Sequence, residues 1–412
     1  MKESNNIKKN IVWNTIGVLT ISSTSLLYTL ILTHFCNLKD VGIFSFAFSF
    51  ACMMITLASF GGRTIHITDS NNNNSNISYI ITKYITVLLT FLIVLIYITI
   101  KSYSITKTTL IIILCLFKFF EEISDVYYGV LQKENYLYKV GIFQTVKSII
   151  NIILFALIIV FSKNIILSSL SILIVNILFA LIIERHAAKT ANNWKFELKT
   201  KEIKNILYQN FYVCFFTFLT SYIISSPKYA IDKYLIDDMQ AIFNIILMPA
   251  TFIYLLAGFI LSPFMVEISK EIEKKEYDKS KKRVIKIISI ILLLGIISLI
   301  GCYYCGIPIL NIIYGIDLTA YKFGFLIIIL GSIMYSISVA ISTILIAYRE
   351  LKIQTIISLV LSILSYLICN ILVKKLSITG GCYAYLIVVS LRALIYIILF
   401  LNVIKKRKRG NN

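Results

Sequence analysis

Apolar runs of about twenty residues alternate with short polar connections along the whole chain. Twenty helical residues rise about 30 Å, which matches the hydrocarbon core of a bilayer. The pattern therefore predicts an all-α integral membrane protein with about twelve transmembrane helices. The predicted spans are residues 11–33, 41–60, 79–100, 107–128, 140–161 and 164–183, followed by residues 205–227, 239–265, 284–306, 321–347, 351–373 and 379–403.

The stretch from residue 226 to residue 267 organises this prediction, because a short polar connection leads there into a long apolar run with prolines at both ends. Pro227 is expected to end the preceding apolar segment. A compact charged turn is expected to follow, made of Lys228, Asp232, Lys233, Asp237 and Asp238. Pro249 falls inside the next span, where it is expected to kink the helix. Kinked membrane helices often border cavities.

The composition excludes a soluble globular protein, because 58% of the residues are hydrophobic and only 15% are charged. The net charge of +20 lies in clusters that follow the span ends, which favours orientation in a membrane over nucleic-acid binding. The N-terminal arm, residues 184–204, residues 266–286 and the tail at 405–409 fall on one side if the number of spans is even. That side should be the cytoplasm, which places both termini there in an inner or plasma membrane.

The two halves of the chain resemble each other, since Gly42-Ile43-Phe44 aligns at a constant offset with Ala241-Ile242-Phe243. We therefore predict two lobes of about six helices each, around a central cavity that opens alternately. The predicted lobes are residues 1–190 and 205–403, with a basic cytoplasmic connection at 191–204 and a basic tail at 404–412.

Enzymatic activity is not expected, because polymerases and glycosyltransferases of membranes usually carry a large outer loop and the predicted outer connections, such as residues 307–320, are short. No catalytic residue is predicted. Cys302 and Cys305 form a CxxC, but no second pair or nearby histidine accompanies it, so no metal site is predicted. The histidines, His66 among them, have no partners at ligand spacing and are assigned no role.

Arg392 is the sharpest candidate for function, because it lies about a dozen residues from either end of the last span. An arginine at that depth stays charged and binds phosphate oxygens in a bidentate manner. The alternative is a structural role, as a buried ion pair or as an arginine capped by backbone carbonyls at a helix contact.

The fourth span carries Lys118, Glu121, Glu122 and Asp125 on one helical face. Such a face cannot point at lipid, and Glu122 lies at nearly the same predicted depth as Lys147 on the fifth span. We predict a pair between Glu122 and Lys147. Two interpretations stay open: a structural ion pair that holds the hairpin, or a protonatable relay with a cationic cavity wall.

Arg63 follows the second span at the cytoplasmic edge. Gly61 and Gly62 precede it and would let backbone or ligand approach closely. Asp69 is its candidate partner. Lys83, near the start of the third span, is expected to extend toward the membrane surface.

Three segments resemble a known family. PKYAIDKYL followed by QAIFNIILMPATFIYLLAGFILSP is similar to the seventh and eighth helices of bacterial polysaccharide flippases, the Wzx-type O-antigen and capsule transporters of the multidrug/oligosaccharidyl-lipid/polysaccharide exporter (MOP) superfamily. SFGGRTIHITD resembles the arginine-containing segment after the second helix of that family, and YYGVLQKENYLYKVGIFQTVKSIINIILF resembles its fourth-to-fifth helix hairpin.

The resemblance implies a two-lobed transporter that flips an undecaprenyl-diphosphate-linked oligosaccharide to the outer leaflet for O-antigen, lipopolysaccharide or capsule assembly. It assigns substrate binding to Arg63, Lys228, Asp232 and Lys233. Depth alone adds Lys118, Lys147 and Arg392 as substrate-binding candidates, with Glu121, Glu122 and Asp125 as a proton or ion relay. No cofactor is implied, and coupling to protons, sodium ions or the membrane potential is left open. The implied partners are the lipid-linked substrate, membrane lipids, and a polysaccharide polymerase with its chain-length machinery.

Two other functions fit the sequence less well. A multidrug cation exporter of the same superfamily would need an acidic and aromatic lining, whereas the excess of deep cations in this chain favours an anionic substrate. A membrane polysaccharide polymerase or glycosyltransferase is disfavoured by the short outer connections.

Overall fold

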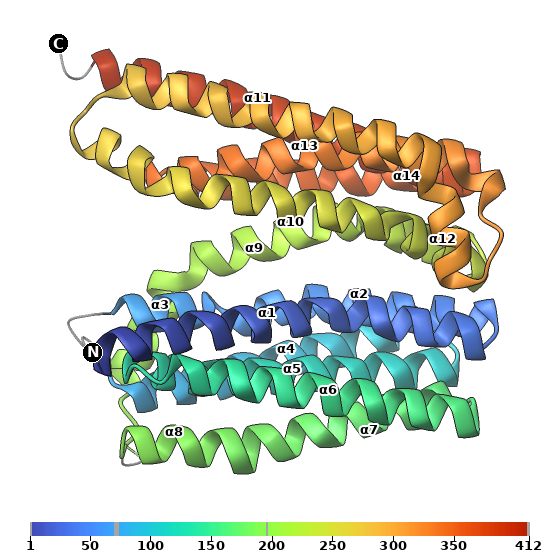
Figure 1. The fold of residues 1–412 in the computed structure, drawn as a ribbon, viewed down its shortest axis with the longest axis horizontal. Coiled ribbons are helices and arrows are strands. Elements are labelled where there is room, and N and C mark those ends of the chain that lie inside the picture. The colour runs from blue at the N-terminus through green and yellow to red at the C-terminus, as the bar shows by residue number, and fades with distance from the viewer. Residues whose placement is uncertain (1, 70–73, 195–196, 410–412) are drawn as a thin grey trace. The chain divides into compact units, whose positions relative to one another are not determined.

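The computed structural model describes residues 2–69, 74–194 and 197–409, and the side chains from residue 9 onward within them. These ranges are helical almost throughout and contain no strand (Figure 1). The elements are α1 (Lys2–Phe35), α2 (Leu38–Ser59), α3 (Gly62–Thr68), α4 (Asn76–Lys101), α5 (Ile105–Lys133), α6 (Leu137–Ser162), α7 (Ile165–Leu178), the π-helical turn η1 (Phe179–Glu184), α8 (Arg185–Ala191), α9 (Thr200–Tyr234), α10 (Asp237–Glu273), α11 (Tyr277–Gly301), the π-helical turn η2 (Cys302–Gly306), α12 (Ile307–Tyr314), the 3₁₀ turn η3 (Thr319–Tyr321), α13 (Lys322–Ala347) and α14 (Leu351–Arg409). Lys195 of the basic connection and residues 410–412 of the tail lie outside the described residues.

The predicted all-helical membrane architecture is confirmed. Within the described ranges, nine helical segments are long and apolar enough to cross a bilayer. The helices α5 and α9 are also long enough, at 29 and 35 residues, but are more polar. The last segment, α14, contains both predicted spans 351–373 and 379–403, which meet where the backbone leaves the helical region at Ser377 (φ 57°, ψ −139°).

The sequence predicted that Pro227 ends its helix, but this is wrong. Pro227 lies inside α9, which continues to Tyr234. The proline leaves the carbonyl of Ile223 without its usual backbone donor. The hydroxyl of Ser226 donates to that carbonyl at 2.8 Å, and the hydroxyl of Ser365 lies 3.5 Å from it. Because side chains of the bundle satisfy the freed carbonyl, the helix can run on.

The charged segment after Pro227 is therefore helical and does not form the predicted turn. Lys228, Asp232 and Lys233 lie on the last turns of α9, while Asp237 and Asp238 begin α10. The predicted loop at 307–320 is also partly wrong, since α12 occupies it as far as Tyr314. Pro249 lies inside α10, as predicted.

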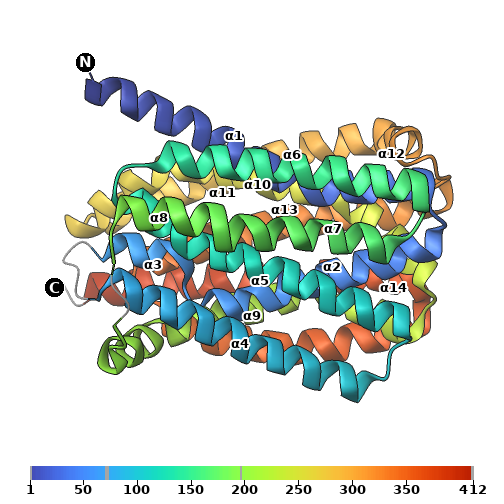
Figure 2. The same cartoon turned by 90° about the horizontal axis from the view of Figure 1, so that it is seen from below.

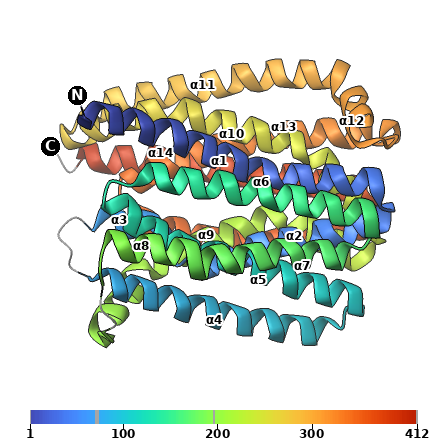
Figure 3. The same ribbon diagram turned by 60° about the horizontal axis from the view of Figure 1, so that its bottom comes forward.

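The chain forms two compact units, Met1–Phe218 and Leu219–Asn412. In unit 1, α1 packs along α6, and α5 packs against α2, α4 and α7 (Figure 2). In unit 2, α13 packs against α14 and α10, and α11 against α10 and α13 (Figure 3). The division falls within α9, whereas the sequence placed the connection at 191–204; which residues act as one lobe stays a prediction.

Glycines allow α1 and α6 to touch. A Cβ atom added at Gly141 would lie 2.1 Å from the backbone oxygen of Trp13, and one at Gly17 would lie 2.9 Å from the Cα atom of Gly141. Replacing Gly141 with alanine should therefore lower the free energy of unfolding by about 1–3 kcal/mol or more, because the clash is with backbone. Thermal unfolding of the purified protein checks this.

Gly258→Ala is the matched control. Gly258 also lies inside a helix, but nothing lies within 4 Å of an added Cβ atom. That variant should be neutral or more stable by about 0.5–1 kcal/mol, since alanine favours the helix. Equal effects of the two substitutions would contradict the proposed helix contact.

The start of α9 is held to the start of α4 through Glu202. Its Oε2 atom accepts hydrogen bonds from the backbone N–H of Ser75 at 2.8 Å, from the Ser75 hydroxyl at 2.6 Å and from the Ser78 hydroxyl at 2.7 Å. Burial alone would raise the pKa of this carboxyl, but the hydrogen bonds from Ser75 and Ser78 outweigh it and lower the pKa to about 2. The stabilisation is therefore fully present above the ordinary glutamate pKa and is lost as pH falls through about 2.

We expect this contact to be unchanged between neutral and mildly acidic pH. Glu202→Gln should weaken it by about 1.5–3 kcal/mol, because three donors lose a charged acceptor. Hydrogen–deuterium exchange at residues 74–78 should then become faster. Glu197→Gln is the control, since the Glu197 side chain is 67% exposed and pairs with Lys199 at 3.4 Å. Equally fast exchange in both variants would refute the contact.

Candidate functional site

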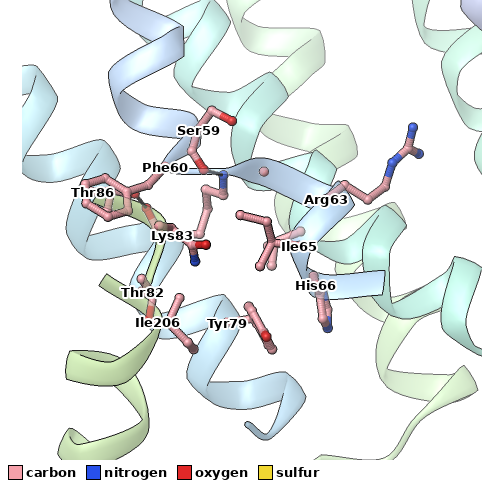
Figure 4. Close-up of a pocket in the computed structure, with 13 residues that line it drawn as sticks. Ser59, Phe60, Arg63, Ile65, His66, Tyr79, Thr82, Lys83, Thr86 and Ile206 are labelled. Carbon is pink, nitrogen blue, oxygen red and sulfur yellow. Dashed lines mark hydrogen bonds between the residues drawn. The ribbon is translucent and has the colours of Figure 1, made fainter. Parts of the chain in front are cut away.

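A pocket in unit 1 forms where α2 gives way to α3 (Figure 4). Phe60, Gly61 and Gly62 all have positive φ angles, of 44°, 92° and 60°, and the two glycines adopt such angles readily. This break turns the chain sharply, so that Arg63 and His66 of α3 line the pocket together with side chains of α2, α4, α5 and α9. The sequence analysis singled out Gly61, Gly62 and Arg63, but it predicted neither the short helix α3 nor the pocket.

Lys83 of α4 also lines this pocket. The sequence predicted that it extends toward the membrane surface, and this is wrong. Its side chain is 7% exposed. The ammonium group donates to the backbone oxygen of Ser59 at 2.6 Å and to Oε2 of Glu122 at 2.7 Å. The end of α2 presents carbonyls without helical partners, so Lys83 finds both an acceptor and a countercharge inside the bundle.

The acidic face of α5 is neutralised one residue at a time. Besides the pair of Glu122 with Lys83, Lys118 donates to Oε2 of Glu121 at 2.7 Å. Asp125 accepts from the backbone N–H of Arg63 at 3.1 Å, and its Oδ1 atom lies 3.5 Å from Nε of the same residue. Each acid of the predicted relay thus has its own cation.

Arg63 therefore pairs with Asp125, while its predicted partner Asp69 serves another contact. The Oδ2 atom of Asp69 accepts from the hydroxyl of Tyr79 at 3.1 Å and from the backbone N–H of Asn74 at 3.1 Å. Asn71–Asn73, which come soon after Asp69 in the sequence, lie outside the described residues.

Lys147 pairs with Glu184, so the predicted pair with Glu122 is wrong. Its ammonium group lies 3.0 Å from Oε1 of Glu184 and 3.0 Å from the hydroxyl of Ser124. The hydroxyl of Tyr128 donates to the same Oε1 atom at 2.5 Å. Glu184 is fully buried at the end of η1.

Sequence reasoning missed Glu184 because it ended the sixth span at residue 183. The signal was present, since the glutamate follows an apolar run directly and the helix continues through η1 into α8. Considering only the adjacent hairpin of α5 and α6 led to the wrong partner for Lys147.

The other predicted cations lie in unit 2. Lys228 is half-buried and donates to Oδ1 of Asn244 on α10 at 2.8 Å. Lys233 is exposed, lies over the ring of Tyr234, and is 3.3 Å from Oδ1 of Asn370. Asp232, one helical turn after Lys228, is half-buried on the same face of α9.

Arg392 of α14 is 1% exposed and has a different environment from every other predicted cation. Its Nη2 atom lies 3.4 Å from the hydroxyl of Thr220, and its guanidinium carbon lies 5.8 Å and 5.2 Å from the ring centres of Tyr335 and Tyr396. Its Nε and Nη1 atoms are buried without a hydrogen-bond partner. Within the described part of the chain, no carboxylate forms a salt bridge with it, so the alternative of a buried ion pair is not what the structure shows.

The predicted site residues thus fall into three groups. Unit 1 gathers Arg63, Lys118, Lys147, Glu121, Glu122 and Asp125 along α5 as ion pairs. Unit 2 holds Lys228, Asp232 and Lys233 at the end of α9, and Arg392 at a separate position in α14. Among the described residues, no group of three or more His, Cys, Asp or Glu side chains could hold a metal ion.

Comparisons with solved structures show that this chain shares its fold with membrane transporters. A multidrug resistance transporter of the MATE family and the MOP superfamily, in an inward-facing conformation, matches with a TM-score of 0.73 at 13% identity, covering 98% of this chain and 100% of that chain. The lipid II flippase MurJ in an inward closed conformation matches with a TM-score of 0.69 at 15% identity, covering 98% of this chain and 90% of that chain. At these identities, the two likenesses establish a shared fold.

A comparison with curated proteins finds a more specific relative. The capsular polysaccharide biosynthesis protein CapF of Staphylococcus aureus is 24% identical over 352 residues, which are 83% of this chain and 86% of CapF. No protein-family model matches the chain. The similar proteins with solved structures are transporters and a flippase rather than enzymes.

Proposed function

Proceeding from the MOP-superfamily transporter fold that this multi-pass membrane protein has, we propose that it flips lipid-linked oligosaccharides. The substrate would be an undecaprenyl-diphosphate-linked repeat unit, moved by alternating access from the cytoplasmic to the outer leaflet for surface polysaccharide assembly. The likeness to CapF supports this substrate class over others carried by the fold.

The observation that carries the proposal is the balance of buried charge. The acids on α5 each have a cationic partner, as does Glu184. Arg392 adds a buried positive charge that no carboxylate in the described ranges neutralises. An interior with surplus positive charge favours an anionic cargo, because a diphosphate entering hydrocarbon without a countercharge would meet a prohibitive penalty.

A multidrug cation exporter is the second candidate, since the MATE transporter has the same fold. A cationic drug would need buried carboxylates that are free to receive it. The neutralised acids of α5 do not offer that, so this function requires the ion pairs to open.

The energetics of the proposed step need no ion gradient. Moving about two negative charges outward across an inside-negative membrane is favourable by roughly 4 to 5 kcal/mol per 100 mV, if the charge crosses the whole field. Under the proposal, the protein sits in the inner or plasma membrane with both termini in the cytoplasm, and it delivers substrate to a polysaccharide polymerase.

The test is the leaflet accessibility of the lipid-linked oligosaccharide in cells depleted of this protein, probed with a lectin or glycosidase added from outside. Glycan that accumulates on the lipid but stays protected until the cells are lysed would support flipping. Accessible but unpolymerised glycan would point to a polymerase instead, and unchanged glycan would reject both and make drug export the next measurement.

A further inference from the structure

Arg392 lies where several helices of unit 2 meet. Its neighbours are Thr220 on α9, Tyr335 on α13 and Tyr396 one turn further along α14. Tyr335 packs in turn against Tyr254 of α10, with ring centres 5.2 Å apart and ring planes at 44°. A guanidinium, a hydroxyl group and a set of tyrosine rings therefore share one small region of unit 2.

The hydrogen-bond donors of this guanidinium are largely unused. Arginine has five N–H donors and keeps its charge in proteins. The contact of Nη2 with the Thr220 hydroxyl, at 3.4 Å, is longer than an ordinary N–H···O hydrogen bond. The faces of the Tyr335 and Tyr396 rings also stabilise the charge. Nε and Nη1 are both buried without a hydrogen-bond partner, so their N–H donors remain available to a ligand.

Some of the side chains around Arg392 are less buried than Arg392 itself. Arg392 itself is buried, but Thr220, Tyr335 and Tyr254 are each half-buried. The hydroxyl-bearing side chains make this patch polar, which suits a polar ligand rather than lipid tails.

We infer that Arg392, with Thr220, Tyr335 and Tyr396, forms a binding site for a phosphate or diphosphate ester. Phosphate oxygens match the planar donor fork of arginine. Tyrosine faces carry partial negative charge and pack well against the C–H faces of a sugar ring. Resting on the proposed function, this site would bind the diphosphate of the lipid-linked substrate and the sugar next to it.

The cations of unit 1 fit this role less well. Lys118, Lys83, Lys147 and Arg63 each have a carboxylate within 3.5 Å. An anion that approached them would meet the negative charge of that partner as well. The anion site is therefore assigned to unit 2, although the resemblance to polysaccharide flippases emphasised other residues.

The test measures ligand-induced thermal stabilisation of the purified full-length protein. The probes are farnesyl diphosphate, inorganic pyrophosphate and, as the phosphate-free control, farnesol. The variants are Arg392→Met and Arg392→Lys, with Arg407→Met as the matched control, because Arg407 lies on the same helix and is 48% exposed. Wild type and Arg407→Met should bind farnesyl diphosphate. Arg392→Met should bind it at least about tenfold more weakly, as a rise in Kd.

The unfolding temperature without ligand shows whether a variant has lost binding because its fold is destabilised. Arg392→Met should unfold at the same or a higher temperature than wild type, because an apolar side chain of similar length replaces a buried charge without a carboxylate partner. A clearly lower temperature, or unchanged binding of farnesyl diphosphate, would overturn the inference in favour of a structural arginine.

Two further comparisons tell a lipid headgroup from a free anion as the ligand, and tell a failure of the anion site from a failure of the proposed function. Tighter, Arg392-dependent binding of farnesyl diphosphate than of pyrophosphate supports a lipid headgroup, whereas equal binding supports a site for the free anion. If Arg392-dependent binding is found but the lipid-linked glycan reaches the outer leaflet normally in depleted cells, the anion site stands and the flippase proposal fails.

Discussion

Replacing Lys147 with methionine should lower the free energy of unfolding by about 3–5 kcal/mol, because the substitution leaves the fully buried Glu184 carboxylate without its countercharge. Breaking one side of a buried pair is costly even where the pair itself adds little net stability. Changing both members should therefore recover most of the loss. The double variant Lys147→Met with Glu184→Gln keeps a carbonyl acceptor for the hydroxyl of Tyr128, which donates to Glu184 in wild type.

A double-mutant cycle on the purified protein, followed by thermal or denaturant unfolding, measures this coupling. Lys279→Met is the control: Lys279 pairs with Glu276 at 3.0 Å, but its side chain is 68% exposed, so its loss should cost about 0.2–1 kcal/mol. If Lys147→Met lowers the free energy of unfolding no more than Lys279→Met does, the buried pair does not stabilise the bundle. If the double variant is stable but inactive in export, the pair of Lys147 and Glu184 has a role in transport besides its structural one.

Arg392→Ala should reduce export of the surface polysaccharide at least about tenfold at normal protein levels, which corresponds to a lost interaction of about 1.4 kcal/mol or more. The buried guanidinium has no carboxylate partner among the described residues, so removing it takes away a strong attraction for an anionic cargo. Membrane insertion should be unaffected, because the change makes the last span more apolar.

Lys228→Ala should also impair export without blocking insertion. Lys228 is half-buried and its ammonium group donates to Asn244, which would orient it for substrate. The measurement is the amount of surface polysaccharide in cells complemented with each variant, normalised to the protein in membrane fractions. Lys279→Ala, at an exposed surface pair, is the control. Wild-type export by the Arg392 and Lys228 variants would remove both residues from the substrate site.

The order and approximate position of the membrane spans followed from the sequence. Bilayer thickness dictates the length of a spanning helix, so apolar runs of about twenty residues located the spans without knowledge of their neighbours. The break between the last two predicted spans, for example, agrees with the non-helical backbone at Ser377. The same rule marked Arg392 and the charges of α5 as exceptional, because charge at that depth is expensive whatever surrounds it.

Proline and glycine signals were harder to interpret. Pro227 looked like a helix end, and only the packed structure shows that Ser226 and Ser365 satisfy the carbonyl it frees. The glycines at 61 and 62 indicated a close approach, but the break they allow and the pocket beside it depend on how α3, α4 and α5 pack.

The sequence by itself determined that this is a helical membrane protein with an excess of buried cations, because span length and charge depth are properties of local sequence. Tertiary structure alone decided which charges cancel. Lys83 meets Glu122, and Lys147 meets Glu184, across separations of 39 and 37 residues that depend on how each helix is rotated and which helix lies beside it. Arg392 differs from these cations because no helix among the described residues brings a carboxylate to it. The local pattern of its own span carries no information about its neighbours.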